Sequence, residues 1–359
     1  MLVRATPAAP ASPPRDLRAG PVMPVPALLR EFGLDPAPFL TRAGIGIDVL
    51  DHPDNRVPFA AVGRLLHECV RGTGCAHFGL LTGHRFDGAT LGALGTLLRH
   101  CESFGAALRC LVMYLHLNDR GGVPVLLNLG PTRVMLGYAI YQPDMPGKAQ
   151  FDDATIAITF NLLRQLCGAH WKPIEVMFAH RAPADAGPYR QLFGPNVRFD
   201  AELSAVTFAA HWLDRPIAGA DPAVRETLKT AFRQAAARDT GALEERVRRA
   251  LHSLAYLAGP ASAPTVARMF NLHERQLRRR LTLEGTSFRH LAHEARREVA
   301  KHLLRDTHLP LSEIAAALHY ADATALSRAF RQWTGVTPGT WRASYAQHGD
   351  EAALPTPSD

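Results

Sequence analysis

Three closely spaced arginines, Arg275, Arg278 and Arg279, are the side chains of this 359-residue protein best suited to chemistry with another molecule. A guanidinium presents several N–H donors in a planar fork, which matches guanine O6 and N7 in DNA and also matches a phosphate. On a helical period, Leu277 and Leu281 share one face, and Arg275 and Arg279 lie on the opposite face. The stretch therefore predicts a helix with an apolar inner face and a cationic outer face.

A basic helical face is often only a solvated surface, so the preceding sequence has to decide its role. Ser262 is a suitable N-cap for a short helix, in which Pro264 is tolerated in the first turn. That helix would bury Val266 and Phe270. Asn271 follows where the chain must turn, and Asn accepts a left-handed backbone. A short helix, a tight turn and a second helix predict a helix-turn-helix, whose second helix enters the major groove of DNA.

The same apolar pattern occurs a second time. The buried positions predicted for the first unit are Val266, Ala267, Phe270, Leu277 and Leu281. Their counterparts, 48 residues later for the first three and 49 for the last two, are Ile314, Ala315, Leu318, Leu326 and Phe330. The second turn is therefore one residue longer, and the chain is predicted to carry two helix-turn-helix units.

The outer faces of the two second helices supply the candidate DNA-binding residues, which are Arg275, Gln276, Arg278, Arg279, Thr324, Ser327, Arg328 and Arg331. Two of the three arginines of the first helix are expected to contact bases. In the second helix Arg328 is the best candidate for a base contact, and Arg331 is assigned to phosphate.

A third helix is predicted between the two units. Gly285 ends the preceding helix, and Thr286 or Ser287 caps the new one, which runs to about Arg305. Nineteen residues at about 1.5 Å each give a length of roughly 28 Å. Successive major grooves on one face of B-DNA are about 34 Å apart. A linker of this length predicts that one chain places its recognition helices in adjacent grooves.

Residues 259–345 closely resemble the DNA-binding domain of the AraC/XylS family of bacterial transcription regulators. The resemblance is carried by RQLRRRLTLEGTSFRHL, EVAKHLLRDTHLPLSEIAAAL and ALSRAFRQWTGVTPGTWR. It implies a sequence-specific DNA-binding regulator, and by the habit of the family an activator. Asn271 and His319 stand in the two turns where the family usually has Gly, and a left-handed conformation costs them roughly 1 kcal/mol or more relative to Gly.

The distribution of charge agrees with a polyanionic partner. The formal net charge is +7, and residues 260–345 hold thirteen Lys and Arg against seven Asp and Glu, which leaves +6 in that segment. Five cysteines without CxxC pairing favour a reducing cytoplasm over a disulfide framework. No apolar run is long enough for a membrane span, and the N-terminus lacks the pattern of a secretory signal.

Residues 26–220 predict an α+β domain, because helical patterns are followed by mostly adjacent strand patterns. The runs VPVLLNLG and RVMLGYAIY suggest a hairpin around Gly130-Pro131, and IEVMFAH, VRFDA and AVTFAA suggest three further strands. The segment resembles the arabinose-binding-like N-terminal domain of one branch of AraC-type regulators, which includes regulators of ornithine use. That resemblance implies a sensor of a small-molecule effector, with ligand-binding residues unknown.

The predicted fold is thus an α+β effector domain followed by an all-α double helix-turn-helix domain. The expected segments are a disordered leader (1–25), the sensing domain (26–220), a helical connector (221–258), the DNA-binding domain (259–345) and a disordered tail (346–359). The connector could also be a dimer surface, although packing against its own chain is the commoner case. Translation could start at Met1 or Met23.

Other candidate sites favour a structural interpretation. His67 with Cys69, and His100 with Cys101, match no zinc spacing. Asp152-Asp153 is interpreted as the opening of a helix, where carboxylates suit the helix dipole. There is no dinucleotide, P-loop or serine-hydrolase motif. No cofactor, metal ion or catalytic residue is predicted.

We therefore expect a cytoplasmic, effector-controlled transcription regulator rather than an enzyme. Its expected partners are double-stranded DNA, a small-molecule effector, RNA polymerase and, in a homodimer, a second copy of the chain. An enzyme with a DNA-binding domain and an architectural DNA binder with an inert N-terminal domain are the alternatives. Turnover of a ligand would favour the first alternative, and a weak ratio of specific to random DNA binding the second.

Overall fold

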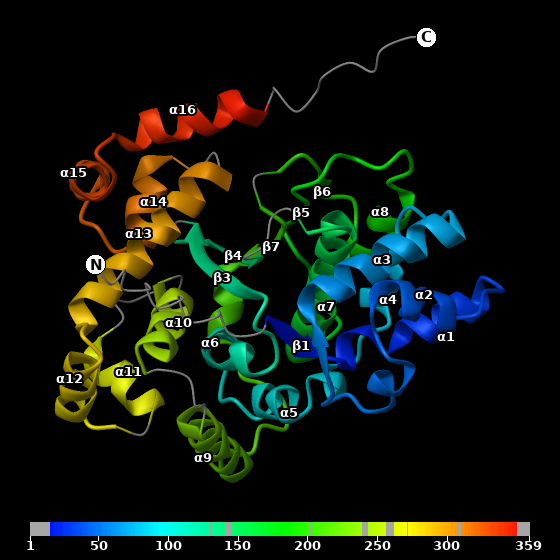
Figure 1. Ribbon diagram of the computed structural model, residues 1–359, viewed down its shortest axis with the longest axis horizontal. Coiled ribbons are helices and arrows are strands. Elements are labelled where there is room, and N and C mark those ends of the chain that lie inside the picture. The colour runs from blue at the N-terminus through cyan, green and yellow to red at the C-terminus, as the bar shows by residue number, and fades with distance from the viewer. Residues whose placement is uncertain are drawn as a thin grey trace, which may run out of the picture.

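The structure is a computed structural model that describes residues 15–129, 131–140, 145–201, 203–238, 243–255, 262–270, 272–306 and 310–349. Figure 1 shows the N-terminal part as helices gathered around a sheet, with the C-terminal helices along one side of it. Asn271, Gly130 and the first 14 residues lie outside the described residues. None of the described helices combines the length and the apolar character needed to cross a membrane.

The N-terminal part contains eight α-helices among its described residues. They are α1 (Pro24–Glu31), α2 (Ala37–Ala43), α3 (Phe59–Thr73), α4 (Phe78–His84), α5 (Ala93–Arg99), α6 (Phe104–Tyr114), α7 (Lys148–Cys167) and α8 (Gly187–Phe193). The strands are β1 (Asp16–Arg18), β2 (Arg56–Pro58), β3 (Gly122–Leu129), β4 (Arg133–Ile140), β5 (Glu175–Met177), β6 (Val197–Arg198) and β7 (Ala205–Ala209). The predicted α+β class is confirmed.

Five of these strands form one sheet in the order β3-β4-β7-β5-β6, and β1 pairs with β2 in a separate small sheet. β3 and β4 are antiparallel over their whole length, from Gly122 opposite Ile140 to Leu129 opposite Arg133. The predicted hairpin and the three predicted later strands are therefore confirmed. β5 and β6 are the parallel pair of the sheet.

The inner face of the sheet packs on α6 and α7. Because side chains alternate between the faces of a strand, Val134 and Leu136 of β4 point inward, as do Val206 and Phe208 of β7. Phe208 meets Phe104 of α6 with ring centroids 5.5 Å apart. This face forms the main core of the N-terminal domain.

The outer face of the same sheet is also buried. The inner-face residues alternate with a second apolar set, which includes Val123, Val125, Leu127, Met135 and Ala205. This set is continuous with buried residues of the C-terminal helices, among them Val299, Leu303, Ile314, Leu326 and Phe330. The second helix-turn-helix unit and the outer face of the sheet therefore share one apolar core.

The C-terminal part is entirely helical where it is described. Its helices are α9 (Pro222–Arg238), α10 (Leu243–Ala255), α11 (Ala263–Met269), α12 (Glu274–Leu283), α13 (Phe288–Asp306), α14 (Leu311–Ala317), α15 (Ala323–Thr334) and α16 (Pro338–Gly349). The predicted all-α arrangement of two helix-turn-helix units, α11–α12 and α14–α15, is confirmed.

The predicted connector, residues 221–258, is divided between the two parts of the molecule. α9 packs on the N-terminal domain, where Phe232 meets Tyr114 with ring centroids 5.1 Å apart and Arg225 pairs with Glu102. α10 instead places Val247 and Leu251 in the core of the first helix-turn-helix unit. The DNA-binding domain therefore begins at about Leu243, not at 259, because the apolar stripe of α10 completes that core.

The predicted leader and tail also differ from the structure. The leader was placed at residues 1–25, but β1 pairs with β2, and Leu17, Ala19 and Val22 are buried in the core. Only residues 1–14 of that leader lie outside the described part. At the other end the predicted tail begins at 346, whereas α16 continues to Gly349. Local composition rich in Pro and Ala concealed the pairing of β1, which depends on a strand about 40 residues away.

The second helix-turn-helix turn has the backbone conformation that the sequence predicted. His319 has φ of 59°, a left-handed value that is unusual for any residue other than Gly. The Tyr320 N–H donates to Ala315 O at 2.8 Å, and Leu272 N–H donates to Ala267 O at 2.9 Å in the first unit. The two turns therefore share the same closing hydrogen bond at an offset of 48 residues.

Substitution of His319 tests this turn. Gly removes the Cβ strain but raises the entropy of the unfolded chain, so His319→Gly is expected to change the free energy of unfolding by no more than about 1 kcal/mol. Val is β-branched and strained at positive φ, so His319→Val is expected to destabilise by roughly 1–2 kcal/mol. Thermal unfolding of the two variants provides the comparison. Equal midpoints would contradict a left-handed residue 319.

Candidate nucleic-acid interface and ligand cavity

The first helix-turn-helix unit is built as the sequence indicated. The Ser262 hydroxyl caps α11 by accepting a hydrogen bond from Thr265 N–H at 3.3 Å. Val266, Ala267 and Phe270 of this unit are buried, together with Leu277 and Leu281 of α12. At the start of α12, Gln276 Oε1 accepts from His273 N–H at 2.9 Å. This contact fixes where the recognition helix begins.

The arginines of α12 lie on its solvent side. Arg275, Arg278 and Arg279 are all exposed, and so is Gln276. Arg278 forms an ion pair with Glu274 one turn earlier on the same helix, which holds its guanidinium along the helix surface. Arg275 and Arg279 therefore have the greater freedom to reach a base, and Gln276 is partly committed to capping the helix.

The second unit has a similar core and a different outer face. Asp322 caps α15 by accepting a hydrogen bond from Ala325 N–H at 2.7 Å. The cap is His273 in the first unit, 49 residues earlier, whereas the turn bonds differ by 48, so the extra residue lies between Tyr320 and Asp322. Thr324, Arg328 and Arg331 are exposed, and Ser327 is half-buried.

The linker helix α13 spans the two units. It has 19 residues, as predicted, and a length of roughly 28 Å at about 1.5 Å per residue. Ser287 provides its cap by accepting a hydrogen bond from His290 N–H at 3.1 Å. In Figure 1, α12 and α15 lie at opposite ends of α13 along the margin of the molecule remote from α1–α4. Their exposed faces are thus available to a long ligand that passes along this margin.

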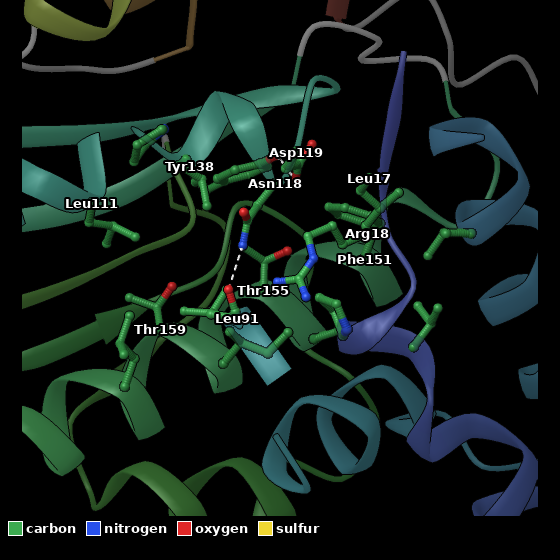
Figure 2. A pocket seen from close by; sticks show the side chains of 18 of the residues that line it. Leu17, Arg18, Leu91, Leu111, Asn118, Asp119, Tyr138, Phe151, Thr155 and Thr159 are labelled. Carbon is green, nitrogen blue, oxygen red and sulfur yellow. Dashed lines mark hydrogen bonds between the residues drawn. The ribbon is translucent and has the colours of Figure 1, made fainter. Parts of the chain in front are cut away.

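A cavity lies inside the N-terminal domain between β1, α3, α6, the sheet and α7 (Figure 2). The space open to the centre of a water-sized sphere is about 100 Å³, several times the 10–15 Å³ or so that one water needs. The lining is mostly apolar and includes Val62, Leu111, Leu136, Phe151 and Leu162. The cavity is large enough for a small organic molecule.

A few polar side chains stand out from this lining. Arg18 is only 8% exposed, and its guanidinium pairs with Asp54 and donates to Thr90 O at 3.3 Å. Its Nε has no hydrogen-bond partner. Asn118 Nδ2 donates to Leu91 O at 3.1 Å. Figure 2 shows the side chains of Arg18, Asn118 and Thr155 turned toward one another, with Leu111 and Thr159 farther along the cavity.

Asp119 is the acidic residue of this lining. The Tyr138 hydroxyl donates to one of its oxygens, and Gly121 N–H donates to the other at 2.8 Å. Burial raises the pKa of Asp119 to about 6, although both hydrogen bonds act to lower it. The carboxyl group is therefore held by partners within the protein.

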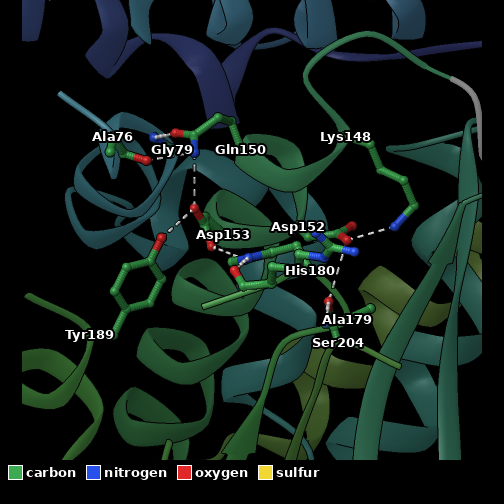
Figure 3. Close-up of polar contacts among 11 residues, drawn as sticks. Ala76, Gly79, Lys148, Gln150, Asp152, Asp153, Ala179, His180, Tyr189 and Ser204 are labelled. Carbon is green, nitrogen blue, oxygen red and sulfur yellow. Dashed lines mark hydrogen bonds and ion pairs between the residues drawn. The ribbon is translucent and has the colours of Figure 1, made fainter. Parts of the chain in front are cut away.

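A second group of polar side chains surrounds Asp152 and Asp153 (Figure 3). Lys148 Nζ pairs with Asp152 at 2.7 Å, and His180 Nε2 donates to Asp153 Oδ1 at 2.8 Å. The Tyr189 hydroxyl also donates to Asp153, at 2.7 Å. Both carboxylates are buried. Two cationic groups therefore balance two buried acids where α7 meets the segment after β5 and α8.

This geometry corrects the interpretation of Asp152-Asp153 as the opening of a helix. α7 begins at Lys148, so the two acids lie in its second turn and serve tertiary contacts. Burial alone would lower the pKa of His180, but its hydrogen bond to Asp153 and the charge of Asp153 raise it above the usual value. The other ring nitrogen faces Arg181 O at 2.9 Å. Since both partners only accept hydrogen bonds, His180 carries a proton on each nitrogen.

The cysteines take no part in a comparable cluster. Cys69 is buried, and its burial raises the pKa of the thiol to about 12. Within the described ranges no three His, Cys, Asp or Glu side chains are grouped so that they could hold a metal ion. The predicted DNA-binding residues and the cavity are therefore the two sites that carry functional chemistry in the described part of the chain.

Two family models match this chain. Residues 33–217, just over half of the protein, match the arabinose-binding domain of AraC transcription regulators, and residues 266–344 match a helix-turn-helix domain. The chain belongs to the AraC family of transcription regulators. The resemblance inferred from the sequence motifs is confirmed.

Curated relatives of this AraC-family regulator extend over nearly the whole chain. The transcriptional regulator VirS of Mycobacterium tuberculosis is 28% identical over 321 residues, which cover 88% of this chain and 93% of VirS. The ornithine utilization regulator of Pseudomonas aeruginosa has the same identity and coverage. The crystal structure of the transcriptional regulator CdpR from Pseudomonas aeruginosa covers 88% of this chain and 98% of its own, at 23% identity and a TM-score of 0.44.

Sequence reasoning assigned no ligand residues in this AraC-family regulator. Arg18 fell within the predicted leader, where no function was attached. The available signal was on α7, where Thr155 and Thr159 stand four residues apart and so share one face of a largely apolar helix. Such a pair shows that a helix face is partly polar, but not that it faces a cavity.

Replacement of Arg279 tests base readout by the regulator. Because Arg279 is exposed on the outer face of α12, Arg279→Ala is expected to cost about 1–3 kcal/mol on the cognate site and to relax discrimination at one base pair. Binding is measured on cognate and random duplexes at fixed salt. Arg99→Ala, which removes an exposed charge from α5, is the control. An equal loss on both duplexes would show that Arg279 contacts only phosphate.

The protonated His180 gives the regulator a pH-dependent term in its stability. A folded-state pKa above the unfolded value means that this contribution is complete below about pH 6.5 and is lost as the pH rises through the folded-state pKa. The stability advantage of the wild type over His180→Gln is therefore expected to shrink as the pH rises from acid to alkaline. Urea unfolding across this range measures it. His170→Gln changes an exposed histidine and should give a constant difference.

Proposed function

We propose that this protein is an effector-responsive activator of transcription, in which a small molecule bound in the cavity of the N-terminal domain changes how the two helix-turn-helix units engage DNA. The observation that carries the proposal is that the elements lining the cavity also contact the DNA-binding part. The proposed base-reading residues are Arg275, Arg279 and Arg328, with Arg331 on phosphate.

Adjacent residues of single elements face the cavity and the DNA-binding part. On α6, Leu111 lines the cavity, while Val112 is buried with the core of the first helix-turn-helix unit. On β4, Leu136 lines the cavity, while Met135 belongs to the core shared with the second unit. A ligand that moves α6 or β4 therefore acts on both units.

β3 repeats this arrangement at the edge of the sheet. Pro124 lines the cavity, and Val125 is buried in the shared core on the opposite face. Because packed interiors transmit displacement rather than absorb it, occupation of the cavity biases the position of the DNA-binding part. The ligand can do so only if it binds the two arrangements with different affinity.

The proposed partners are double-stranded DNA, the effector and, for activation, RNA polymerase, which places the protein in the cytoplasm with the DNA. α13 supports one chain in two adjacent major grooves, because its length of roughly 28 Å plus the width of the units approaches the groove repeat of about 34 Å. A footprint upstream of the neighbouring genes tests this. Protection of a single groove segment per chain would contradict it. Pairing of two chains on the operator is a further proposal, tested by the mass of the complex.

A cavity-filling variant tests control by the effector. Ile158 of α7 lines the cavity, so Ile158→Trp is expected to occupy the space without touching the DNA-binding face. Wild-type operator affinity should respond to a low-molecular-weight extract of the cells by about 5- to 150-fold. The variant should retain its basal affinity and lose the response.

The matched control is Arg164→Trp, which adds the same ring to an exposed position of α7. It should respond as the wild type does. A response that survives Ile158→Trp would exclude this cavity as the effector site. Consumption of the active component by the purified protein would instead support the enzyme alternative.

A further inference from the structure

We infer that the cavity is built for a small amphipathic carboxylate, a molecule with one anionic head and an unbranched apolar body. This inference rests on the proposed effector role of the cavity and names the chemical class of its ligand. The polar end of the cavity carries the argument, because it contains a buried cation with unused hydrogen-bonding capacity.

Arg18 is the cation in question. Five guanidinium N–H groups are available, and the described contacts are one ion pair with Asp54 and one hydrogen bond to Thr90 O. Nε is buried without a partner. An unpaired buried donor on a charged group is costly, and a carboxylate relieves that cost with charge-assisted hydrogen bonds.

The backbone around Arg18 leaves room for the guanidinium and nothing larger. A Cβ on Gly92 would lie 2.6 Å from Arg18 Nη2 and 2.7 Å from Nη1. Gly92 also has φ of 59°, which side chains rarely adopt. The loop after Leu91 thus approaches the guanidinium closely because residue 92 is glycine, and it confines the head group of Arg18 to the cavity wall.

Neighbouring donors complete an anion-binding end. Thr155 contributes a hydroxyl, and Asn118 contributes an amide whose Nδ2 already donates to Leu91 O at 3.1 Å. Figure 2 shows both side chains directed toward Arg18. The second carboxylate oxygen of a ligand would meet the Thr155 hydroxyl while the first meets Arg18.

The rest of the lining excludes other classes of ligand. Asp119 is the one acidic residue among the lining residues, and each of its oxygens already accepts a hydrogen bond, from Tyr138 or from Gly121. A cationic head would compete with those bonds and would face Arg18. Beyond the polar end the walls are Leu111, Ile158 and Leu162, which suit an alkyl body.

Three probes of equal chain length test the class: octanoate, octanol and octylammonium. Each is titrated into the full-length protein, and affinity is measured by calorimetry and by the shift in the unfolding midpoint. Octanoate is expected to bind roughly tenfold or more tighter than octanol, the ratio given by one charge-assisted hydrogen bond, and octylammonium weakest. Hexanoate and decanoate measure the length that the apolar end accepts.

Arg18→Met should weaken octanoate by about 10- to 100-fold and leave octanol unchanged, because only the head-group contact is removed. Arg64→Met removes a guanidinium from α3 that does not line the cavity and should alter neither. If Arg18→Met does not fold, Thr155→Val should reduce the preference for octanoate over octanol. Ile158→Trp should abolish binding of both.

Equal binding of the three probes, or a preference for octylammonium, would overturn the carboxylate class while leaving the cavity as an effector site. Binding that survives Ile158→Trp, or no binding of any probe to the wild type, would also overturn the inference. The proposed function fails on a different measurement, when octanoate binds in the cavity but operator affinity and transcription do not change.

Discussion

Burial of both faces of the five-stranded sheet is the constraint on which the rest of this regulator depends. Antiparallel strands commonly leave one face to solvent, yet here the inner face packs on α6 and α7 and the outer face on the second helix-turn-helix unit. Each apolar residue of the outer face that leaves water contributes roughly 1.5–3 kcal/mol. This contact sets the position of the DNA-binding part relative to the cavity.

The same contact makes the regulator responsive without a long mechanical path. A strand only one residue wide separates the two environments, since Leu136 and Met135 point to opposite faces of β4. A ligand therefore needs to shift a strand or α6 by a small amount to alter a packed interface. The first unit is linked in the same way through Val112, which is fully buried beside α10 and α12.

Buried charge is handled differently in the two halves of the N-terminal domain. Asp152 and Asp153 are balanced by Lys148 and by a doubly protonated His180, so that their cluster is closed and structural. Arg18 is left with an unused Nε beside an apolar space. A satisfied network rigidifies α7 against the segment after β5, and an unsatisfied cation beside a cavity invites a ligand.

Much of the DNA-binding half followed from the sequence alone. The repeated apolar positions, the caps at Ser262 and Ser287, the left-handed His319 and the 19-residue linker helix are local features, decided by periodicity and by turn chemistry within a few residues. The β3–β4 hairpin was predictable for the same reason. The family resemblance followed from these motifs as well.

Other features were decided only by the tertiary structure, because they depend on residues far apart in the chain. β1 is ordered by pairing with β2, α10 by the core of the first helix-turn-helix unit, and the acids of α7 by His180 and Tyr189. The cavity likewise assembles segments from Leu17 to Leu162. A local pattern records which face of an element is apolar, whereas only packing determines whether that face meets a protein core, a second domain or an empty space.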